Sequence, residues 1–311
     1  MLKETIYSLK APYRDELRVT GYRFGSGEKA ACIVGAIRGN EIQQLYICSQ
    51  LIKVLKELEQ RGAIAGNQEI LVIPSVNQYS MNIEKRFWAV DNTDINRMFP
   101  GYNQGETTQR IAAGVFEKAK GYSYGIQFAS FYMPGDFVPH VRMMKTGYHN
   151  PSLANLFGLP YVVIRKPRPI DTTTLNYNWQ LWETNAFSVY TKETDNIDEQ
   201  SAQMAVSAVL RFLTRMGILR YNSHSGYIAS VIYEDELTTV HADEAGILRR
   251  YHFPGEEVHR GDVLAEVLDP YEGTVKAKIE SPTDGIIFFS HKKPLVIQKD
   301  IVCRIIRRLH Q

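Results

Sequence analysis

The stretch AACIVGAIRGNEIQQLYICSQLIKVLKELEQRG, residues 30–62, decides the fold. It opens with an apolar run, 31–37, whose small and branched side chains predict a buried parallel strand. After a polar turn, apolar side chains recur at helical spacing from Ile42 to Leu58, and Gly62 provides a C-terminal stop. The stretch therefore predicts a strand, a tight turn and a helix.

The same alternation continues along the chain. Apolar runs predict further strands at 69–76, 124–130, 160–165 and 187–191. Helical spacing predicts helices at 107–121 and 198–216, the second one closed by Gly217. Strands that alternate with helices indicate a mostly parallel sheet covered on both faces. We therefore expect an α/β domain over residues 1–218.

The pattern changes after Leu219, where short strands alternate with turn signals. These signals are FPGEE (253–257), HRGD (259–262), DPYEG (269–273) and SPTDG (281–285). We expect a small all-β domain over residues 219–311. Its spacing resembles the barrel-sandwich hybrid of lipoyl and biotinyl carrier domains, but its hairpin tip, DPYEG, holds no lysine. We interpret it as a structural or gating module, with a carrier function as the weaker alternative.

Composition limits the classes of partner. The chain has 36 basic and 34 acidic residues and a formal net charge of +2, which gives no general attraction to nucleic acid or anionic membranes. The apolar run 30–37 is far shorter than the roughly 20 residues of a membrane helix. The N-terminal MLKETIYSLK carries charges where a signal peptide needs an apolar core. Three separate cysteines, Cys32, Cys48 and Cys303, indicate buried thiols in a reducing compartment, so we expect a cytoplasmic protein.

Three segments end at the edge of the sheet where ligands of open α/β folds bind: GAIRGNE (35–41), KRFWAVDNTDINRMFPG (85–101) and IQFASFYMPGDFVPHVR (126–142). Their order and spacing resemble the succinylglutamate desuccinylase/aspartoacylase family, zinc-dependent amidohydrolases on a zinc-carboxypeptidase fold. The resemblance spans about residues 30 to 218. It implies a mostly parallel mixed sheet flanked by helices, and the β appendage fits it too.

The most specific match is DINRMFPG, residues 94–101, preceded by Arg86, which corresponds to the family's R…DxNRxFPG signature. The resemblance implies that Arg86, Asn96 and Arg97 hold the substrate's carboxylate. A guanidinium suits this role because its planar fork satisfies both carboxylate oxygens. The alternative is that Asp94 pairs with Arg86 or Arg97 to brace a loop.

The metal motif departs from the family. The resemblance implies a first motif HGNE, in which Glu41 is kept but Arg38 replaces the histidine, and a second motif DLHT, in which Ala129 replaces the histidine. A stable zinc site needs three or four N, S or O ligands. We therefore expect no metal cofactor, although the family uses zinc, and we expect Arg38 to form an ion pair with Glu41 at about the place of the metal.

The acid–base group is also altered. The family's catalytic glutamate aligns with Tyr190, and Glu193 reaches the site as a general base only if the loop after the strand bulges. His140 is the remaining candidate. With Glu41, Asp136 and Glu193 it could build a relocated metal site, although a lone histidine after a proline is more often a hydrogen-bonded loop residue.

Two functions remain open. The first is a non-catalytic family member that binds a small carboxylate-bearing ligand, or that forms a homo-oligomer or partners an active paralogue. The second is a metal-dependent hydrolase of N-acyl amino acids or peptide C-termini with a remodelled site. The missing ligands favour the first, since the loss of a metal ligand costs more affinity than changes around the ligands do.

Overall fold

The computed structural model describes residues 1–12 and 14–308. It divides into an α/β unit, Met1–Ser130 with Pro139–Val231, and a β unit, Phe131–Val138 with Ile232–Gln311. These units differ in two places from the division expected at 218/219. Residues 219–231 belong to the α/β unit, and residues 131–138 belong to the β unit.

The α/β unit is built on a nine-stranded mixed sheet with the order β1-β2-β4-β3-β5-β9-β7-β8-β10. The central neighbours β4, β3, β5 and β9 run parallel, as do β7 and β8, whereas β1, β2 and β7 pair antiparallel with their neighbours β2, β4 and β9. The strands are β1 (Leu2–Ala11), β2 (Arg14–Gly25), β3 (Glu28–Ala36), β4 (Gln68–Ser75), β5 (Tyr124–Ala129), β7 (His140–Met144), β8 (Tyr161–Arg165), β9 (Asn185–Tyr190) and β10 (Ser230–Tyr233).

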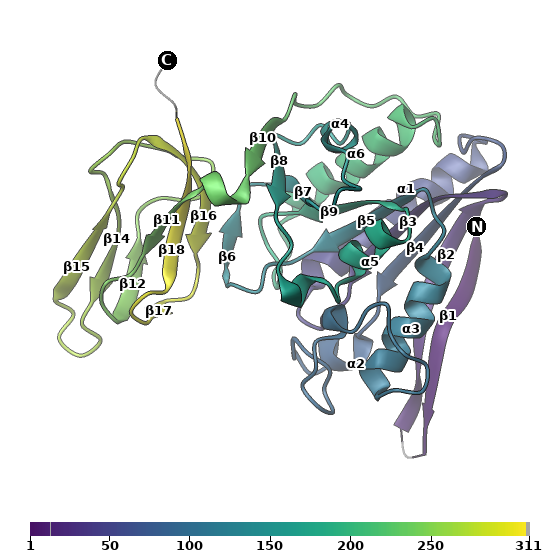
Figure 1. Cartoon of the computed structure of the whole chain (residues 1–311), viewed down its shortest axis with the longest axis horizontal. Coiled ribbons are helices and arrows are strands. Elements are labelled where there is room, and N and C mark those ends of the chain that lie inside the picture. The colour runs from purple at the N-terminus through teal and green to yellow at the C-terminus, as the bar shows by residue number, and fades with distance from the viewer. Residues whose placement is uncertain (13, 309–311) are drawn as a thin grey trace. The chain divides into compact units, whose positions relative to one another are not determined.

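Helices cover both faces of this sheet (Figure 1). Side chains of α1 and α6 join one apolar core, and side chains of α3 and α5 join the other. No helix in the described part of the chain has the length and apolar character to cross a membrane. The helices are α1 (Ile42–Gln60), α2 (Gln78–Met81), α3 (Thr107–Ala119), α4 (Pro151–Asn155), α5 (Leu175–Leu181) and α6 (Glu199–Arg215), with short 3₁₀ turns η1 (Ile95–Arg97) and η2 (Pro169–Asp171).

The expected α/β architecture is confirmed, and the expected elements lie within a few residues of those observed. Gly62 follows the end of α1 with a φ of 67°, a conformation that glycine adopts without steric cost. Cys32, Cys48 and Cys303 are buried free thiols, as expected. The sequence interpretation missed the β1–β2 hairpin, because its charged residues alternate with the apolar ones that face the core.

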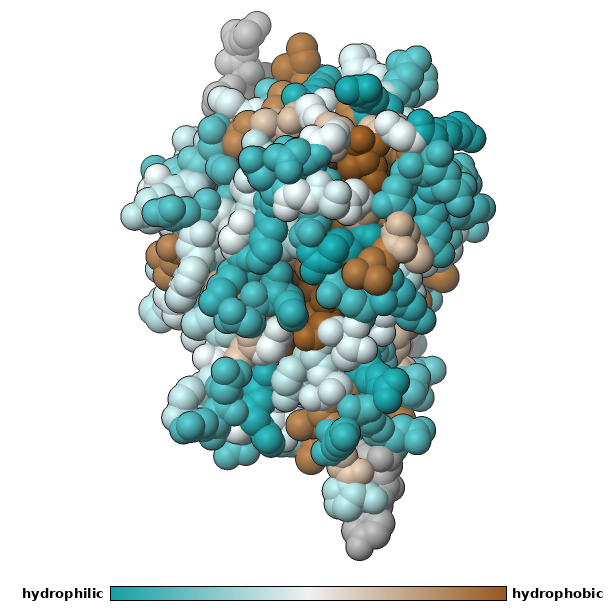
Figure 2. All heavy atoms as spheres, turned by 90° about the vertical axis from the view of Figure 1, so that its right-hand side faces the viewer, coloured by the Kyte–Doolittle hydropathy of each residue, from teal (hydrophilic) through white to brown (hydrophobic). Residues whose placement is uncertain are grey.

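Strand β1 forms one edge of the large sheet. Lys3 and Lys10 on this strand are exposed, and charged side chains on an edge strand hinder pairing with another chain. The side of the α/β unit that carries β1 is mostly hydrophilic, with small separate hydrophobic patches (Figure 2). These charged side chains therefore hinder the pairing of this edge with a strand of another molecule.

The β unit consists of two sheets that share one apolar core. One sheet has the order β11-β18-β16-β13, with β6 paired to β16, and the other has the order β15-β14-β12-β17. Its short 3₁₀ turn is η3 (Glu234–Glu236). The strands are β6 (Gly135–Phe137), β11 (Thr238–His241), β12 (Gly246–Arg250), β13 (Glu257–Val258), β14 (Val263–Leu268), β15 (Val275–Glu280), β16 (Gly285–His291), β17 (Leu295–Val296) and β18 (Ile301–Arg307).

Strand β6 explains why residues 131–138 belong to the β unit. It pairs antiparallel with β16, which places Phe137 opposite Phe289. The two rings lie 4.7 Å apart between centroids. A Cβ at Gly135 would lie 2.0 Å from the Phe289 ring, so glycine allows this close pairing. The segment between two strands of the large sheet therefore completes the smaller one.

A glycine in the centre of the large sheet offers a test of the packing. A Cβ at Gly125 would lie 2.6 Å from the indole of Trp179, which is fully buried. We expect Gly125→Ala to lower the free energy of unfolding by about 1–3 kcal/mol, because the indole cannot move away within a packed core. Chemical denaturation measures this change. Gly66→Ala is the control, since a Cβ there meets no atom within 4 Å; equal effects would contradict the packing of α5 on β5.

Candidate functional site

The turn between β3 and α1 holds a fully buried carboxylate, Glu41. Its Oε2 accepts hydrogen bonds from the backbone nitrogens of Ile37 (2.8 Å) and Arg38 (2.9 Å). Its Oε1 accepts from Nη1 of Arg38 (3.2 Å) and from the hydroxyl of Ser130. Glu41 directly precedes α1, but its side chain makes no capping bond to the helix. Its carboxylate instead fixes the turn that carries Arg38.

Arg38 lies between two carboxylates. Its Nε donates to both oxygens of Asp94 at 3.1 Å, and its Nη2 lies 2.8 Å from Oδ2 of Asp94. Burial by itself would lower the pKa of Arg38, but the charges and hydrogen bonds of Glu41 and Asp94 raise it above the ordinary value for arginine. The guanidinium therefore stays charged although only 5% of the residue is exposed.

The ion pair expected between Arg38 and Glu41 is confirmed. For the second partner, Asp94, the sequence left open as an alternative a pairing with Arg86 or Arg97. Its Oδ2 does lie 3.9 Å from Nε of Arg97, but its shorter contacts are with Arg38. The turn of residues 38–41 and the segment 94–97 are thus tied together by one buried cation.

These residues do not fit a zinc ion. An arginine has no lone pair to offer a metal, and Ala129 has no donor atom. The carboxylate of Glu41 already accepts four hydrogen bonds. Across residues 1–12 and 14–308, no group of three or more His, Cys, Asp or Glu side chains could hold a metal ion. Asp136, a member of the relocated set considered above, instead pairs with Arg250 in the β unit at 2.9 Å.

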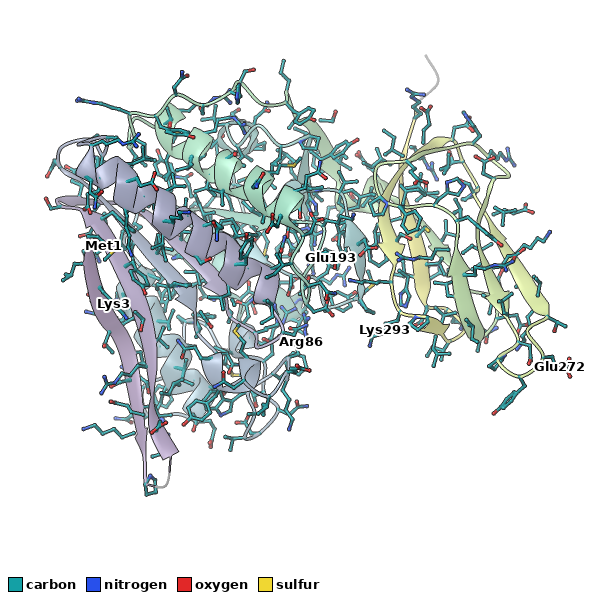
Figure 3. The ribbon with its side chains drawn as sticks, turned by 180° about the vertical axis from the view of Figure 1, so that it is seen from behind. Met1, Lys3, Arg86, Glu193, Glu272 and Lys293 are labelled. Atoms are coloured by element: carbon teal, nitrogen blue, oxygen red, sulfur yellow. The ribbon has the colours of Figure 1, made fainter. Side chains whose placement is uncertain are left out.

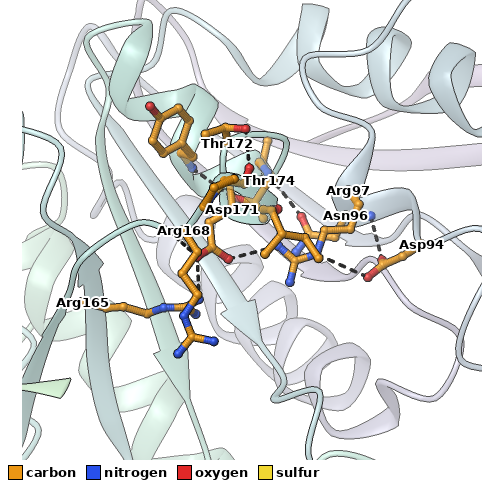
Figure 4. Close-up of polar contacts among 12 residues, drawn as sticks. Asp94, Asn96, Arg97, Arg165, Arg168, Asp171, Thr172 and Thr174 are labelled. Atoms are coloured by element: carbon orange, nitrogen blue, oxygen red, sulfur yellow. Dashed lines mark hydrogen bonds and ion pairs between the residues drawn. The ribbon is translucent and has the colours of Figure 1, made fainter. Parts of the chain in front are cut away.

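Arg97 and Asn96 face the loop that leads to α5 (Figure 4). Nη1 of Arg97 donates to the carbonyl of Ile170 (2.7 Å) and to Oδ1 of Asp171 (3.1 Å). Oδ1 of Asn96 accepts from the backbone nitrogen of Leu175 (3.3 Å). Among the residues that the structure describes, neither Nη2 of Arg97 nor Nδ2 of Asn96 makes a hydrogen bond. Each side chain is therefore held in place by one of its hydrogen-bonding groups, and a second nitrogen can still donate to a ligand.

Asp171 is the carboxylate that anchors this loop. Its Oδ2 accepts from Nη2 of Arg165 (2.5 Å) and from the backbone nitrogen of Arg168 (2.9 Å), while its Oδ1 faces Arg97. It is 1% exposed. The sequence interpretation missed Asp171, since it lies far from the matched motifs. The PRPID segment after β8 was its one local signal, because it predicts a turn capped by an acidic side chain.

Arg86 lies beside the buried pair. Its backbone carbonyl accepts from Gly39 in the turn (2.9 Å). Burial and the charge of Arg38 lower the pKa of Arg86, and the charges of Glu41, Asp94 and Tyr190 only partly oppose this. The surroundings of Arg86 thus disfavour additional positive charge, and an anion there would be stabilised.

Tyr190, which aligns with the family's catalytic glutamate, meets the candidate His140 at the end of β9. Tyr190 ends this strand and lies in register with Ala129 on β5 and with His140 on β7. Its ring stacks on His140 at 4.8 Å and lies 4.8 Å from the guanidinium of Arg142. Arg142, which the sequence interpretation did not single out, is 4% exposed. His140 is fully buried, so it is a stacked strand residue rather than a loop residue.

Glu193 follows in the loop after β9. Figure 3 shows Glu193 and Arg86 near the same end of α1. The neighbouring Thr194 accepts a backbone hydrogen bond from Gln43 at the start of α1 (3.1 Å), and the carbonyl of Glu193 accepts from the hydroxyl of Thr191 (3.1 Å). The loop is therefore held against the helix that begins after Glu41, and the Glu193 side chain is partly exposed there.

The buried cation offers a direct test of the network. Arg38→Met should lower the free energy of unfolding by about 3–5 kcal/mol, since it leaves the carboxylates of Glu41 and Asp94 uncompensated in the interior. Adding Glu41→Gln and Asp94→Asn should recover part of this loss. Arg18→Met is the control, because the Arg18 side chain is 66% exposed in its pair with Glu16 and should change stability by less than about 1 kcal/mol. Equal losses for the two single variants would exclude a structural role for the network.

Comparison with known proteins identifies the family of this chain. Residues 28–215 match the model of the succinylglutamate desuccinylase/aspartoacylase catalytic domain. A search of curated sequences gives no match.

Solved structures share the whole fold. A succinylglutamate desuccinylase/aspartoacylase of Rhodobacter sphaeroides is 18% identical, with a TM-score of 0.76 over 95% of this chain and 91% of that one. The product-bound ectoine utilization protein EutE (DoeB) of Ruegeria pomeroyi is 18% identical, with a TM-score of 0.78 over 98% of this chain and 93% of that one. A putative family member of Shewanella frigidimarina is 16% identical, with a TM-score of 0.78 over 98% and 96%. With its family model matched over most of the α/β unit, this chain belongs to the succinylglutamate desuccinylase/aspartoacylase family.

Proposed function

We propose that this chain is a family member without metal-dependent hydrolysis, which binds a small carboxylate-bearing ligand. The observation that carries the proposal is the position of Arg38, whose guanidinium is enclosed by Glu41 and Asp94. In the family pattern a histidine occupies this place and a second histidine occupies that of Ala129. Here the positive charge next to Glu41 comes from a side chain rather than from a metal.

This exchange keeps charge but changes the chemistry. A zinc ion lowers the pKa of a bound water and polarises a carbonyl, because it has an open coordination position. A guanidinium has none, so it supplies hydrogen bonds and positive charge alone. The reaction of the family therefore lacks its nucleophile, while electrostatic binding of an anion is retained.

Three side chains support a carboxylate ligand. Arg86 lies where burial and Arg38 disfavour further positive charge, so an anion would relieve both effects. Arg97 and Asn96 are each fixed by one hydrogen-bonding group and keep a second nitrogen without a partner among the described residues. Such half-anchored donors bind an anion at a low entropic cost because their positions are already set.

We also propose that the protein is cytoplasmic and that it has a protein partner. The three separate thiols favour a reducing cytoplasm, since disulfides are rare there. A homo-oligomer or an active paralogue is a further partner that this function would suit, because a binding protein without catalysis acts through another molecule.

Metal analysis tests the loss of hydrolysis. Protein purified with zinc in excess and then dialysed should hold no stoichiometric zinc and should not hydrolyse acetylaspartate or succinylglutamate, because Arg38 excludes the ion. Mass spectrometry of the metal content and an amine-release assay measure these outcomes. One zinc per chain, together with chelator-sensitive hydrolysis, would favour the alternative of a remodelled hydrolase.

Restoring the two histidines of the family pattern tests whether their loss explains the loss of zinc binding. Arg38→His with Ala129→His should bind zinc measurably, since two imidazoles then lie beside Glu41. Arg38→Ala, which frees the space without adding ligands, is the matched control and should not. Hydrolysis should stay about 10²–10⁴-fold below that of an active family member, because Tyr190 stands at the position of the general base. Failure of the folded double variant to bind zinc would show that Ala129 is not the second ligand position.

Calorimetric titration with succinate tests the carboxylate site. Arg97→Ala should weaken binding by about 1.5–3 kcal/mol, the range for a hydrogen bond to a charged group. Arg168→Ala, an exposed arginine in the neighbouring loop, should leave binding nearly unchanged. If Arg97→Ala lowers the melting temperature but not the affinity, Arg97 only braces the loop through Asp171.

A further inference from the structure

A row of polar side chains crosses the middle of the large sheet. Gln127 on β5 lies in register with Ser188 on β9, and Ser188 lies in register with Arg142 on β7. Gln127 and Ser188 each lie two residues before the last residue of their strand, Ala129 and Tyr190. Because alternate residues of a strand point to the same face, the row shares a face with Ala129 and Tyr190. The polar row therefore lies directly below Ala129 and Tyr190, on the same face of the sheet.

Helix α5 adds a second amide to this row. Nδ2 of Asn176 donates to the hydroxyl of Ser188 at 3.1 Å. Gln127 and Asn176 are each 2% exposed, and Ser188 is 7% exposed. In the neighbouring strand β3, the residue in register with Gln127 is the buried Val34. Gln127 thus occupies a place where the neighbouring strand buries an apolar side chain, and Asn176 of α5 lies against the same part of the sheet.

Each amide has a buried group that lacks a hydrogen bond. Within the described part of the chain, Nε2 of Gln127 and Oδ1 of Asn176 have no partner and are closed to solvent. Native proteins seldom leave such groups unpaired, because each one lowers stability. Residues that lower stability in this way concentrate at functional sites.

We propose that Gln127 and Asn176 bind the uncharged end of the ligand, and that the ligand is a small carboxylate that also carries a carboxamide. This inference rests on the proposed function, since the arginines hold the carboxylate end. The amide pair offers one donor and one acceptor. A carboxamide matches both: its carbonyl accepts from Nε2 of Gln127, and its N–H donates to Oδ1 of Asn176.

The order of the groups sets the direction of the ligand. Tyr190 and Ala129 lie in the row between the amide pair and the sheet edge, and Arg38, Arg86 and Arg97 belong to the loops at that edge. The carboxylate end therefore stays with the arginines while the carboxamide end passes beside Tyr190. At the amide pair itself a second carboxylate offers no donor to Oδ1 of Asn176 and loses more hydration on burial. The buried guanidinium of Arg142 in the same row would favour a second carboxylate, so succinate is the probe that opposes the inference.

Three probes of similar shape test the inference by calorimetric titration. Succinamate carries a carboxylate and a carboxamide, succinate carries two carboxylates, and 4-methylpentanoate carries one carboxylate and an apolar end. We expect succinamate to bind about tenfold more tightly than 4-methylpentanoate, the effect of a satisfied pair of hydrogen bonds, and more tightly than succinate. Equal binding of all three would keep the carboxylate site and overturn the amide site. Tighter binding of succinate would overturn it as well, and binding of none would overturn both proposals.

A variant separates this role from a structural one. Gln127→Leu should reduce the preference for succinamate to less than about threefold and should not lower the melting temperature, because the lost donor had no partner. Gln43→Leu is the matched control. Gln43 is also a buried glutamine, but it bonds to the backbone of Asp198 and the hydroxyl of Ser201. The control should lower the melting temperature and keep the preference. If Gln127→Leu behaves like Gln43→Leu, Gln127 is structural and the inference is wrong.

Discussion

The buried cation of Arg38 is the interaction on which the arrangement of this site depends. Removing an ion from water costs several kcal/mol, and attraction to a partner offsets that cost only when the geometry and the remaining hydrogen bonds are good. Arg38 meets this condition with Glu41 on one side and Asp94 on the other. The turn after β3 and the segment before η1 must therefore be in place together.

The same constraint extends to the next loop. Asp94 lies near Arg97, Arg97 bonds to Asp171, and Asp171 bonds to Arg165 at the end of β8. Cations and carboxylates alternate along this series, so each charge has an opposite neighbour. Three loops that are distant in sequence are fixed by one another, which leaves Asn96 and Arg97 in defined positions for a ligand.

The polar row beneath the site shows the opposite tendency. Charges at the sheet edge are paired, whereas the amides of Gln127 and Asn176 each leave one group without a partner among the described residues. A sheet optimised for stability alone would place apolar side chains there. The groups without a partner among the described residues therefore lie in two places, the remaining donors of Asn96 and Arg97 at the sheet edge and the two amides in the interior.

The sequence by itself determined the alternation of strands and helices, the family signature around residues 94–101, the pairing of Arg38 with Glu41 and the separate β region after the α/β unit. These features depend on local periodicity or on residues a few positions apart, where spacing fixes which side chains can meet. The tertiary structure decided that Asp94 is the second partner of Arg38, that Asp171 anchors Arg97, and that β6 completes the sheet of the β unit. It also decided that Asn176 bonds to Ser188, the residue in register with Gln127. Each of these contacts joins segments whose distance in space is set by strand order and register, and neither quantity is encoded in the residues that touch.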